Sequence, residues 1–189
     1  MKALVLLAGC GLGDGSCIEE VVLTYLAMEK RQWTYQPAAH AMEMPAVNHI
    51  SEQQEGTRNV LIESARIGRG RVKELNAVRA EDFDCLVIPG GMGLLGNYKN
   101  DESVRKLVLS FSEQHKPIAA MCAGIYFLRY ILGEDLLREE CKTLHANGFC
   151  CDKKRNVYYT PAFGKAGNLC DVQQGIDCMI GKLDSCNQK

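Results

Sequence analysis

The stretch that decides the fold is residues 117–124, which read PIAAMCAG. Residues 117–121 are apolar and predict a buried strand, while the mainly apolar residues 125–132 predict a helix. Between them stands Cys122, with small residues on both sides, as in the strand–turn–helix arrangement of a nucleophile elbow. Small neighbours let the strand and helix backbones approach closely, and the turn lifts the cysteine out of the sheet. We therefore predict that Cys122 is a nucleophile; the alternative is one more buried cysteine.

Outward from this stretch, apolar runs alternate with helical patterns along the chain. We expect strands at 3–7, 33–36, 85–88, 117–121, 142–145 and 157–159, and helices at 16–30, 59–67, 101–115, 125–132 and 168–183, with no clear periodicity over 45–60. This alternation implies parallel βαβ units in a layered α/β sheet. We find no repeat or linker and expect one domain over residues 1–189. Active sites in such sheets lie beyond the carboxyl ends of the strands.

A glycine-rich turn follows the strand expected at 85–88. Residues 89–93 read PGGMG, and glycines allow a backbone to approach a ligand and to aim N–H groups at it. Gly90 and Gly91 are therefore candidate substrate-binding residues, and their amides would stabilise an oxyanion together with the amide of Ala123. The alternative is an ordinary flexible turn.

A carboxylate is expected at the same edge, after the first strand. Ser16 and Glu19 match the capping pattern Ser-x-x-Glu, which predicts a helix that starts at Ser16 and is capped by Glu19. Glu20 is then free to face Cys122, the alternative being a glutamate that complements the helix dipole. The dipole at Cys122 favours a thiolate and predicts a thiol pKa below about 8.5. A Glu20 paired with that thiolate must be protonated, which requires burial.

Composition excludes several classes of function. The formal net charge is −1, which gives no basis for binding nucleic acid or an anionic membrane. The apolar run before Cys10 has about six residues, too few for a signal peptide. There are ten cysteines, but His145 beside Cys150 and Cys151 has poor spacing for zinc, so we expect no metal. We expect a cytoplasmic protein, or one of an organellar matrix after removal of a targeting segment not present here.

Together these motifs resemble the ThiJ/PfpI superfamily of class I glutamine amidotransferase-like proteins, and within it the ElbB type. The resemblance covers most of the chain, and the motif RNVLIESAR is quite specific to the ElbB type. The matching stretches are residues 9–11, 14–16, Glu20, 22–24, 48–49, 58–66 (RNVLIESAR), 88–91, 116–117, 121–122 and 160–162.

The resemblance implies a flavodoxin-like three-layer sandwich with a mostly parallel sheet, often as a homodimer. It implies that Cys122 is the elbow cysteine and Glu20 its carboxylate partner. ElbB-type proteins are associated with a glyoxalase activity that needs neither glutathione nor another cofactor. We therefore expect a small reactive carbonyl as substrate, with glyoxal-type α-oxoaldehydes converted to 2-hydroxy acids through a cysteine hemithioacetal. Deglycation is a further activity proposed for the superfamily. The rival hypothesis is a redox sensor or protective protein in which Cys122 is oxidised.

The chain departs from the ElbB pattern in three places. Residues 123–125 read AGI where ElbB-type proteins usually have Ile-Ala-Pro, the loop around 95–97 is short, and the stretch 133–157 is compressed. Within this last stretch, residues 142–145 resemble a strand on which other ThiJ relatives carry an active-site histidine. His145 is therefore a candidate third catalytic residue, the alternative being an ordinary histidine at a strand end.

Overall fold

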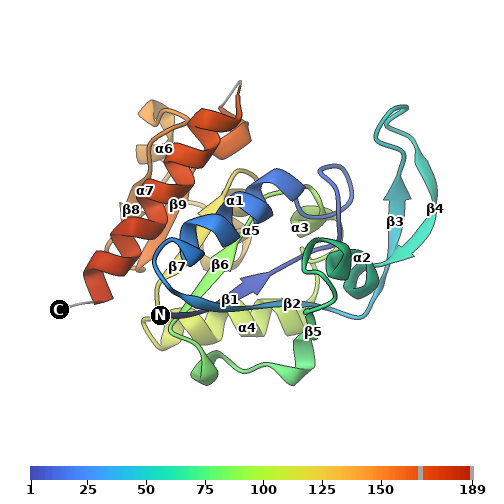
Figure 1. Cartoon of the computed structure of the whole chain (residues 1–189), viewed down its shortest axis with the longest axis horizontal. Helices are drawn as coiled ribbons and strands as arrows, with labels where there is room; N and C mark the ends of the chain where they lie inside the picture. Colours follow the sequence, from blue (N-terminus) through green and yellow to red (C-terminus); the bar gives the residue numbers. More distant parts are fainter. Residues whose placement is uncertain (166–167, 188–189) are drawn as a thin grey trace.

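The computed structural model describes residues 1–165 and 168–187, and its centre is a seven-stranded sheet (Figure 1). The strands are β1 (Lys2–Leu6), β2 (Thr34–Ala39), β5 (Lys73–Glu74), β6 (Cys85–Ile88), β7 (Ile118–Met121), β8 (Cys150–Asp152) and β9 (Val157–Thr160). They lie in the order β5-β2-β1-β6-β7-β9-β8, and only β8 runs antiparallel to its neighbour. Strands β6, β7 and β9 are buried along their whole length, as a parallel sheet covered on both faces requires.

Helices cover both faces of this sheet and complete the three layers. They are α1 (Ile18–Glu29), α2 (Val60–Ile67), α3 (Gly93–Gly96), α4 (Glu102–Glu113), α5 (Gly124–Leu132), α6 (Glu140–Thr143) and α7 (Leu169–Asn187), with short 3₁₀ turns η1 (Leu75–Ala77), η2 (Ala80–Asp82) and η3 (Ala162–Gly164). Helix α1 packs against α2 and α7, while α4 packs against α5. Figure 1 shows α1 and α4 on opposite sides of β1 and β2. The predicted flavodoxin-like α/β sandwich is confirmed.

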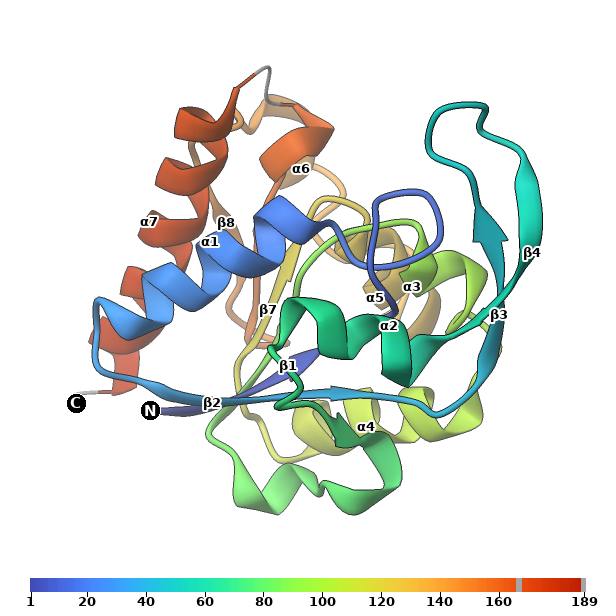
Figure 2. The ribbon, with the colours of Figure 1, turned by 45° about the vertical axis from the view of Figure 1, so that its right-hand side comes forward.

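A two-stranded hairpin stands away from the sandwich, where no regular structure was predicted. It consists of β3 (Glu43–Val47) and β4 (Gln54–Asn59), and Figures 1 and 2 show it projecting beyond α2. In β3, the buried Met44 and Ala46 alternate with exposed neighbours, whereas β4 is exposed along almost its whole length. A strand that is exposed on both faces carries no alternating pattern, so the sequence did not reveal it.

The start of α1 differs from the prediction. The helix begins at Ile18, and Cys17 occupies the cap position without a side-chain capping bond. The hydroxyl of Ser16 is used elsewhere, because its Oγ accepts a hydrogen bond of 2.9 Å from the amide of Ala8 at the end of β1. Glu19 accepts a hydrogen bond of 3.2 Å from the Cys17 thiol. The capping box was therefore wrong: Ser16 ties the glycine-rich loop to the sheet instead of capping the helix.

The strand predicted at 142–145 was also wrong. Residues Glu140–Thr143 form the short helix α6, none of whose residues is buried. The place beside β9 is taken by β8, formed by Cys150–Asp152. A segment without buried side chains gains little from a place in the sheet, and the partly buried residues of β8 occupy that edge instead.

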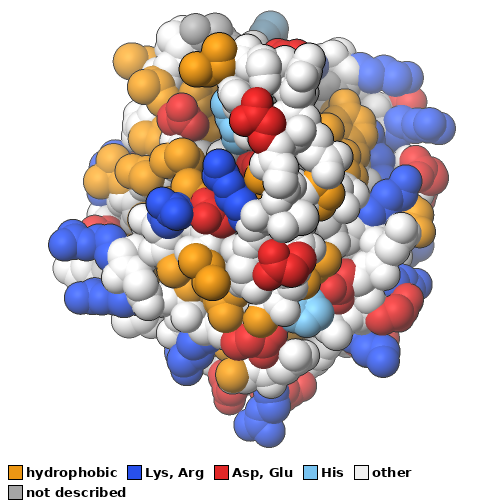
Figure 3. Space-filling view, turned by 90° about the vertical axis from the view of Figure 1, so that its right-hand side faces the viewer, with side chains coloured by type: hydrophobic (Ala, Val, Ile, Leu, Met, Phe, Trp, Pro, Cys, Tyr) orange, Lys and Arg blue, Asp and Glu red, His pale blue; other side chains and the backbone are white. Residues whose placement is uncertain are grey.

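The surface carries mixed charge. Figure 3 shows the face that bears the β3–β4 hairpin, where acidic and basic side chains are interspersed, in keeping with the formal net charge of −1. Among the residues that the structure describes, no helix combines the length and apolar character needed to cross a bilayer.

Candidate active site

Cys122 lies on a sharp turn between β7 and α5, as predicted. Its backbone is in the left-handed region, with φ of +46°, and its amide donates a hydrogen bond of 3.1 Å to the carbonyl of Thr160. That conformation costs a non-glycine residue about 1–3 kcal/mol and is found where the surrounding structure imposes it. A side chain at Gly124 would place its Cβ 3.2 Å from the Cβ of Ala120, so small residues are needed on both sides of the turn. The nucleophile-elbow geometry is confirmed.

Glu20 is the carboxylate at this turn. It lies in the first turn of α1 and its side chain is fully buried, whereas that of Glu19 is exposed. One carboxylate oxygen, Oε2, accepts a hydrogen bond of 2.7 Å from the amide of Gly90, and Oε1 accepts one of 3.4 Å from the amide of Phe163. Burial raises the pKa of Glu20 to about 7, against a smaller opposing effect of these bonds and of a bond with Cys122. Glu20 is thus a buried acid that titrates near neutral pH.

Gly90 marks the point at which Glu20 and Cys122 meet. A Cβ atom added to Gly90 would lie 2.5 Å from Oε2 of Glu20 and 2.6 Å from Cβ of Cys122. Both distances are too short for any side chain. The glycine is therefore required, because the Gly90 backbone packs directly against both the carboxylate and Cys122.

Gly91 has a different role in the same turn. Its φ is +118°, and an added Cβ would overlap the carbonyl oxygen of Gly15. Within residues 1–165 and 168–187 its amide donates no hydrogen bond, although Gly91 is buried and does not line the cavity described below. The amides of Ala123 and Gly164 both face the Cys122 sulfur. The structure thus brings Gly90 and Ala123 to the elbow, whereas Gly91 packs against the loop before α1. The Gly90 amide was expected to help hold an oxyanion, but it donates to Glu20 instead. A role of the Gly91 and Ala123 amides in holding an oxyanion stays a prediction.

The thiol of Cys122 does not have the lowered pKa that its helix position predicted. Burial raises its pKa to about 11, and the negative charge of Glu20 acts in the same direction. The amides of Ala123 and Gly164 lower it by less. Because Glu20 has the lower pKa of the two, it loses its proton first, and above about pH 7 the pair is a thiol that donates to a carboxylate. This reverses the expected pairing of a thiolate with a protonated Glu20.

A cavity of about 410 Å³ opens at the Cys122 thiol. Its two cationic side chains, Arg129 and Lys165, are held by backbone carbonyls: Arg129 donates to Leu136 (2.9 Å) and Lys165 to Cys141 (2.8 Å). Because these partners are neutral, they do not cancel the two positive charges, so the cavity favours an anionic ligand. The lining residues are Met92, Leu95, Cys122, Ala123, Ile125, Tyr126, Arg129, Cys141, Tyr159, Gly164 and Lys165.

Several of these lining residues were missed from the sequence. Tyr126 and Arg129 are three residues apart on α5, and this spacing after the elbow is a signal that could have revealed them. Cys141 and Lys165 carry no such signal, because Cys141 lies on the short helix α6 and Lys165 directly follows η3.

The structure does not bring His145 to the site. Its side chain is exposed in the turn after α6, and it is not among the residues that line the cavity. Its carbonyl accepts a hydrogen bond of 3.0 Å from the amide of Gly148. The histidine was expected at the end of a strand, and that segment is the helix α6 followed by a turn. The geometry therefore gives a Cys122–Glu20 pair without a histidine in contact.

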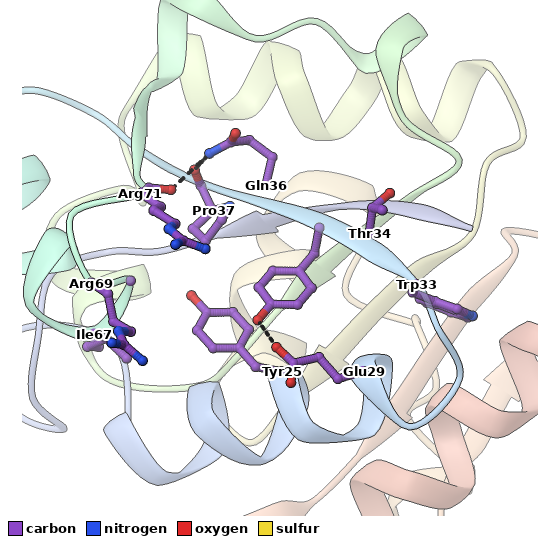
Figure 4. Close-up of a pocket in the computed structure, with 11 residues that line it drawn as sticks. Tyr25, Glu29, Trp33, Thr34, Gln36, Pro37, Ile67, Arg69 and Arg71 are labelled. Carbon is purple, nitrogen blue, oxygen red and sulfur yellow. Dashed lines mark hydrogen bonds between the residues drawn. The ribbon is translucent and has the colours of Figure 1, made fainter.

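A larger cavity, of about 540 Å³, lies between α1, β2 and the end of α2 (Figure 4). Its wall includes the stacked rings of Tyr25 and Tyr35, 4.6 Å apart, and Tyr35 donates a hydrogen bond of 2.6 Å to Glu29. Arg69 and Arg71 lie at its rim (Figure 4). None of its lining residues is a cysteine, so the nucleophile and its acid stay with the smaller cavity.

Two known proteins are similar to this chain over nearly its whole length. The mitochondrial ES1 protein homolog of Rattus norvegicus is 27% identical over 221 residues, which cover 96% of this chain and 82% of that protein. The crystal structure of an isoprenoid biosynthesis protein with an amidotransferase-like domain from Ehrlichia chaffeensis superposes with a TM-score of 0.90 at 28% identity, over 98% of this chain and all of that one.

A more distant structure shares the fold alone. Glyoxalase III from Candida albicans superposes with a TM-score of 0.59 at 12% identity, over 98% of this chain and 96% of that one. Residues 22–146, well over half of the chain, match the model of the DJ-1/PfpI family. With the elbow cysteine and the three-layer sandwich, this match shows that the chain belongs to the DJ-1/PfpI family.

Proposed function

We propose that this protein is an ElbB-type, cofactor-independent glyoxalase that converts glyoxal-type α-oxoaldehydes to 2-hydroxy acids. One observation carries the proposal: the fully buried Glu20 meets the elbow thiol of Cys122 across Gly90. A base with a pKa of about 7 beside a protonated thiol can take its proton as the sulfur attacks a carbonyl. The proposed reaction has two steps, and Glu20 acts in both.

In the first step the Cys122 sulfur adds to one aldehyde carbon of glyoxal, and the thiol proton passes to Glu20. The C–S bond forms as the carbonyl double bond becomes a C–O single bond, giving a hemithioacetal. Amides of Gly91 and Ala123 stabilise the developing oxyanion until it takes the proton from Glu20, which leaves Glu20 as a carboxylate again.

In the second step Glu20, as carboxylate, removes the proton from the sulfur-bearing carbon and returns one to the neighbouring carbon through an enediol. One carbon is oxidised to a thioester and the other is reduced to an alcohol, so no external electron acceptor is needed. Water then cleaves the thioester, releasing glycolate and restoring the thiol. Arg129 and Lys165 attract the anionic product in the cavity.

The rival role, a redox sensor centred on Cys122, has less support from the geometry. A thiolate is the species that peroxides oxidise, and burial together with Glu20 raises the pKa of this thiol. The arrangement favours a thiol that is deprotonated only as its substrate arrives.

The test is product analysis with purified protein and glyoxal. We expect stoichiometric glycolate without glutathione or added metal, and none from Cys122→Ser. Cys170→Ser, which alters an exposed cysteine on α7, is the matched control and should keep full turnover. Glyoxal consumption without glycolate, or equal glycolate from Cys122→Ser, would contradict the proposal. Deglycation is tested in the same assay by replacing glyoxal with an early glycation adduct.

The proposal also includes the oligomeric state of the protein and its compartment. The protein acts as a homodimer, which sedimentation of the purified protein tests. It works in the cytoplasm or in an organellar matrix; the rat relative is named as mitochondrial, and imaging of the tagged protein in its own cells distinguishes the two.

A further inference from the structure

A second cysteine, Cys141, lies in the wall of the same cavity as Cys122. It belongs to α6, its side chain is half-buried, and it lines the cavity together with Tyr159. The Tyr159 hydroxyl donates a hydrogen bond of 3.4 Å to the carbonyl of Cys122, which places this tyrosine beside the elbow. The cavity therefore holds two thiols, and the proposed glyoxalase reaction uses only one.

The sheet register brings a third thiol to this place. In the antiparallel pair of β8 and β9, Cys150 lies directly opposite Tyr159, and Cys151 lies opposite Tyr158. Directly opposed residues share a face of the sheet, and consecutive residues point to opposite faces. Because Tyr159 faces the cavity, Cys150 lies on the cavity side and Cys151 on the other. In agreement with this, the Cys141 and Cys150 thiols lie close enough to shift each other's pKa in opposite directions.

The surroundings of this pair favour one thiolate. The hydrogen bond from Cys150 lowers the pKa of Cys141 to about 7, and the charges of Arg129 and Lys165 act in the same direction. Burial and the charge of Glu140 oppose them. Conversely, the bond with Cys141 raises the pKa of Cys150. The pair thus combines a reactive thiolate with a neighbouring thiol that still holds its proton.

We propose that Cys141 and Cys150 form a dithiol that a small hydroperoxide oxidises to a reversible disulfide in the wall of the Cys122 cavity. The Cys141 sulfur attacks one peroxide oxygen, the O–O bond breaks, and the alcohol or water leaves with a proton from solvent. Cys141 then carries a sulfenic acid. The Cys150 sulfur attacks it, an S–S bond replaces the S–O bond, and water leaves with the Cys150 proton. Two thiols lose two electrons, and the peroxide gains them.

The location of Cys141 allows the movement that bond formation needs. A disulfide brings two sulfur atoms to about 2.05 Å, closer than a hydrogen bond between thiols. Helix α6 has four residues and none of them is buried, so it can shift without disturbing the core. This activity is independent of the proposed glyoxalase reaction, because neither Cys122 nor Glu20 takes part in it.

The test is treatment of the full-length protein with a small excess of hydrogen peroxide, followed by alkylation, trypsin digestion and mass spectrometry. Cys141 lies in the peptide 139–142 and Cys150 in the peptide 143–153, so the disulfide joins two peptides with the loss of two hydrogen atoms. We expect this cross-link in the wild-type protein, and we expect dithiothreitol to remove it.

Cys150 and its neighbour provide matched variants. Cys150→Ser should abolish the cross-link, while Cys151→Ser, one residue along the same strand, should keep it. Cys150→Ala serves as a second variant if the serine lowers the melting temperature. Cys122→Ser should keep the cross-link, which separates this proposal from the glyoxalase proposal. A bond from Cys141 to Cys151 or Cys122, or oxidation of Cys122 with Cys141 and Cys150 left free, would overturn the inference.

Discussion

Cys122 and Cys141 line one cavity, yet the structure surrounds them in opposite ways. Cys122 lies beside a buried carboxylate, and burial with that charge raises its pKa to about 11. Cys141 lies beside a thiol donor and two cations, and its pKa is lowered to about 7. The difference teaches that an elbow position does not by itself make a thiolate. In the proposed reaction Cys122 needs Glu20 to take its proton when a substrate arrives, whereas about half of Cys141 is already thiolate near pH 7.

The two cysteines should differ most in their effect on catalytic turnover. We expect Cys122→Ser to reduce glycolate formation from glyoxal to the uncatalysed level, because a serine hydroxyl is a much weaker nucleophile at neutral pH. Cys141→Ser should retain turnover, since that thiol forms no bond to substrate. Glycolate measured by NMR, with thermal melting of each variant, checks both. If a folded Cys141→Ser variant lost as much activity as Cys122→Ser, the assignment of the nucleophile would be wrong.

The second prediction concerns the two adjacent glutamates of α1. Glu20→Gln removes the base and should lower kcat by at least about 10²-fold, the smaller end of the range for general acid–base catalysis. Glu19→Gln alters an exposed side chain and should stay near wild-type activity. Steady-state kinetics with glyoxal gives both values. Wild-type kcat/KM should also rise as pH increases through about 7, because only the carboxylate form of Glu20 accepts the thiol proton. A flat profile from pH 5 to 8 would contradict this role.

The third prediction compares the two thiols directly by alkylation. Near pH 7 about half of Cys141 is thiolate, against about one part in 10⁴ of Cys122. A thiolate of lower pKa is intrinsically less nucleophilic, by about 10² over this interval. Iodoacetamide should therefore modify Cys141 about 10²-fold faster, as followed by peptide mass spectrometry.

The same experiment tests the interaction between Cys122 and Glu20. Glu20→Gln removes a charge that raises the pKa of Cys122, so its alkylation should begin at lower pH, while that of Cys141 should not change. Faster modification of Cys122 than of Cys141 in the wild-type protein at pH 7 would contradict the lower pKa of Cys141.

The sequence predicted that Glu20, Gly90 and Cys122 lie together, but it did not predict that Cys141 lies at the same cavity, and the reason is physical. Glu20, Gly90 and Cys122 each follow a buried parallel strand, and such strands deliver the residues after them to one edge of the sheet. Cys141 reaches the cavity through a segment without periodicity, so its place depends on packing that no local pattern records. His145 lies in the same segment, and for this reason a family resemblance placed it on a strand that does not form.

The pKa of Cys122 could not be predicted from local sequence patterns either. The helix N-terminus beside Cys122 is visible in the sequence and predicts a lowered pKa. The burial that opposes it, and the charge of Glu20 beside the thiol, arise only when the chain is folded. The β3–β4 hairpin was missed for a related reason, since a strand exposed on both faces has no apolar alternation to detect.

The last prediction concerns stability, where the effect is smallest. Glu20 has a pKa of about 7 in the folded protein against an ordinary value of 4.5. Below pH 4.5 both folded and unfolded chains hold this proton. Between 4.5 and 7 the folded protein keeps it and the unfolded chain releases it, so rising pH favours unfolding. The 2.5-unit difference (7 − 4.5) corresponds to about 3 kcal/mol, which the wild-type protein loses as pH rises through 7.

Glu20→Gln cannot titrate and should not lose this contribution. Its free energy of unfolding relative to wild type should therefore rise by about 3 kcal/mol between pH 4.5 and pH 8, as measured by urea denaturation at both values. Glu19→Gln, with its exposed side chain, should follow the wild-type pH dependence and is the matched control. If the difference between Glu20→Gln and wild type were the same at both pH values, Glu20 would titrate near its ordinary value. A glutamate of that kind would be too weak a base to draw the proton from the Cys122 thiol, and the contrast between the two cysteines would need another cause.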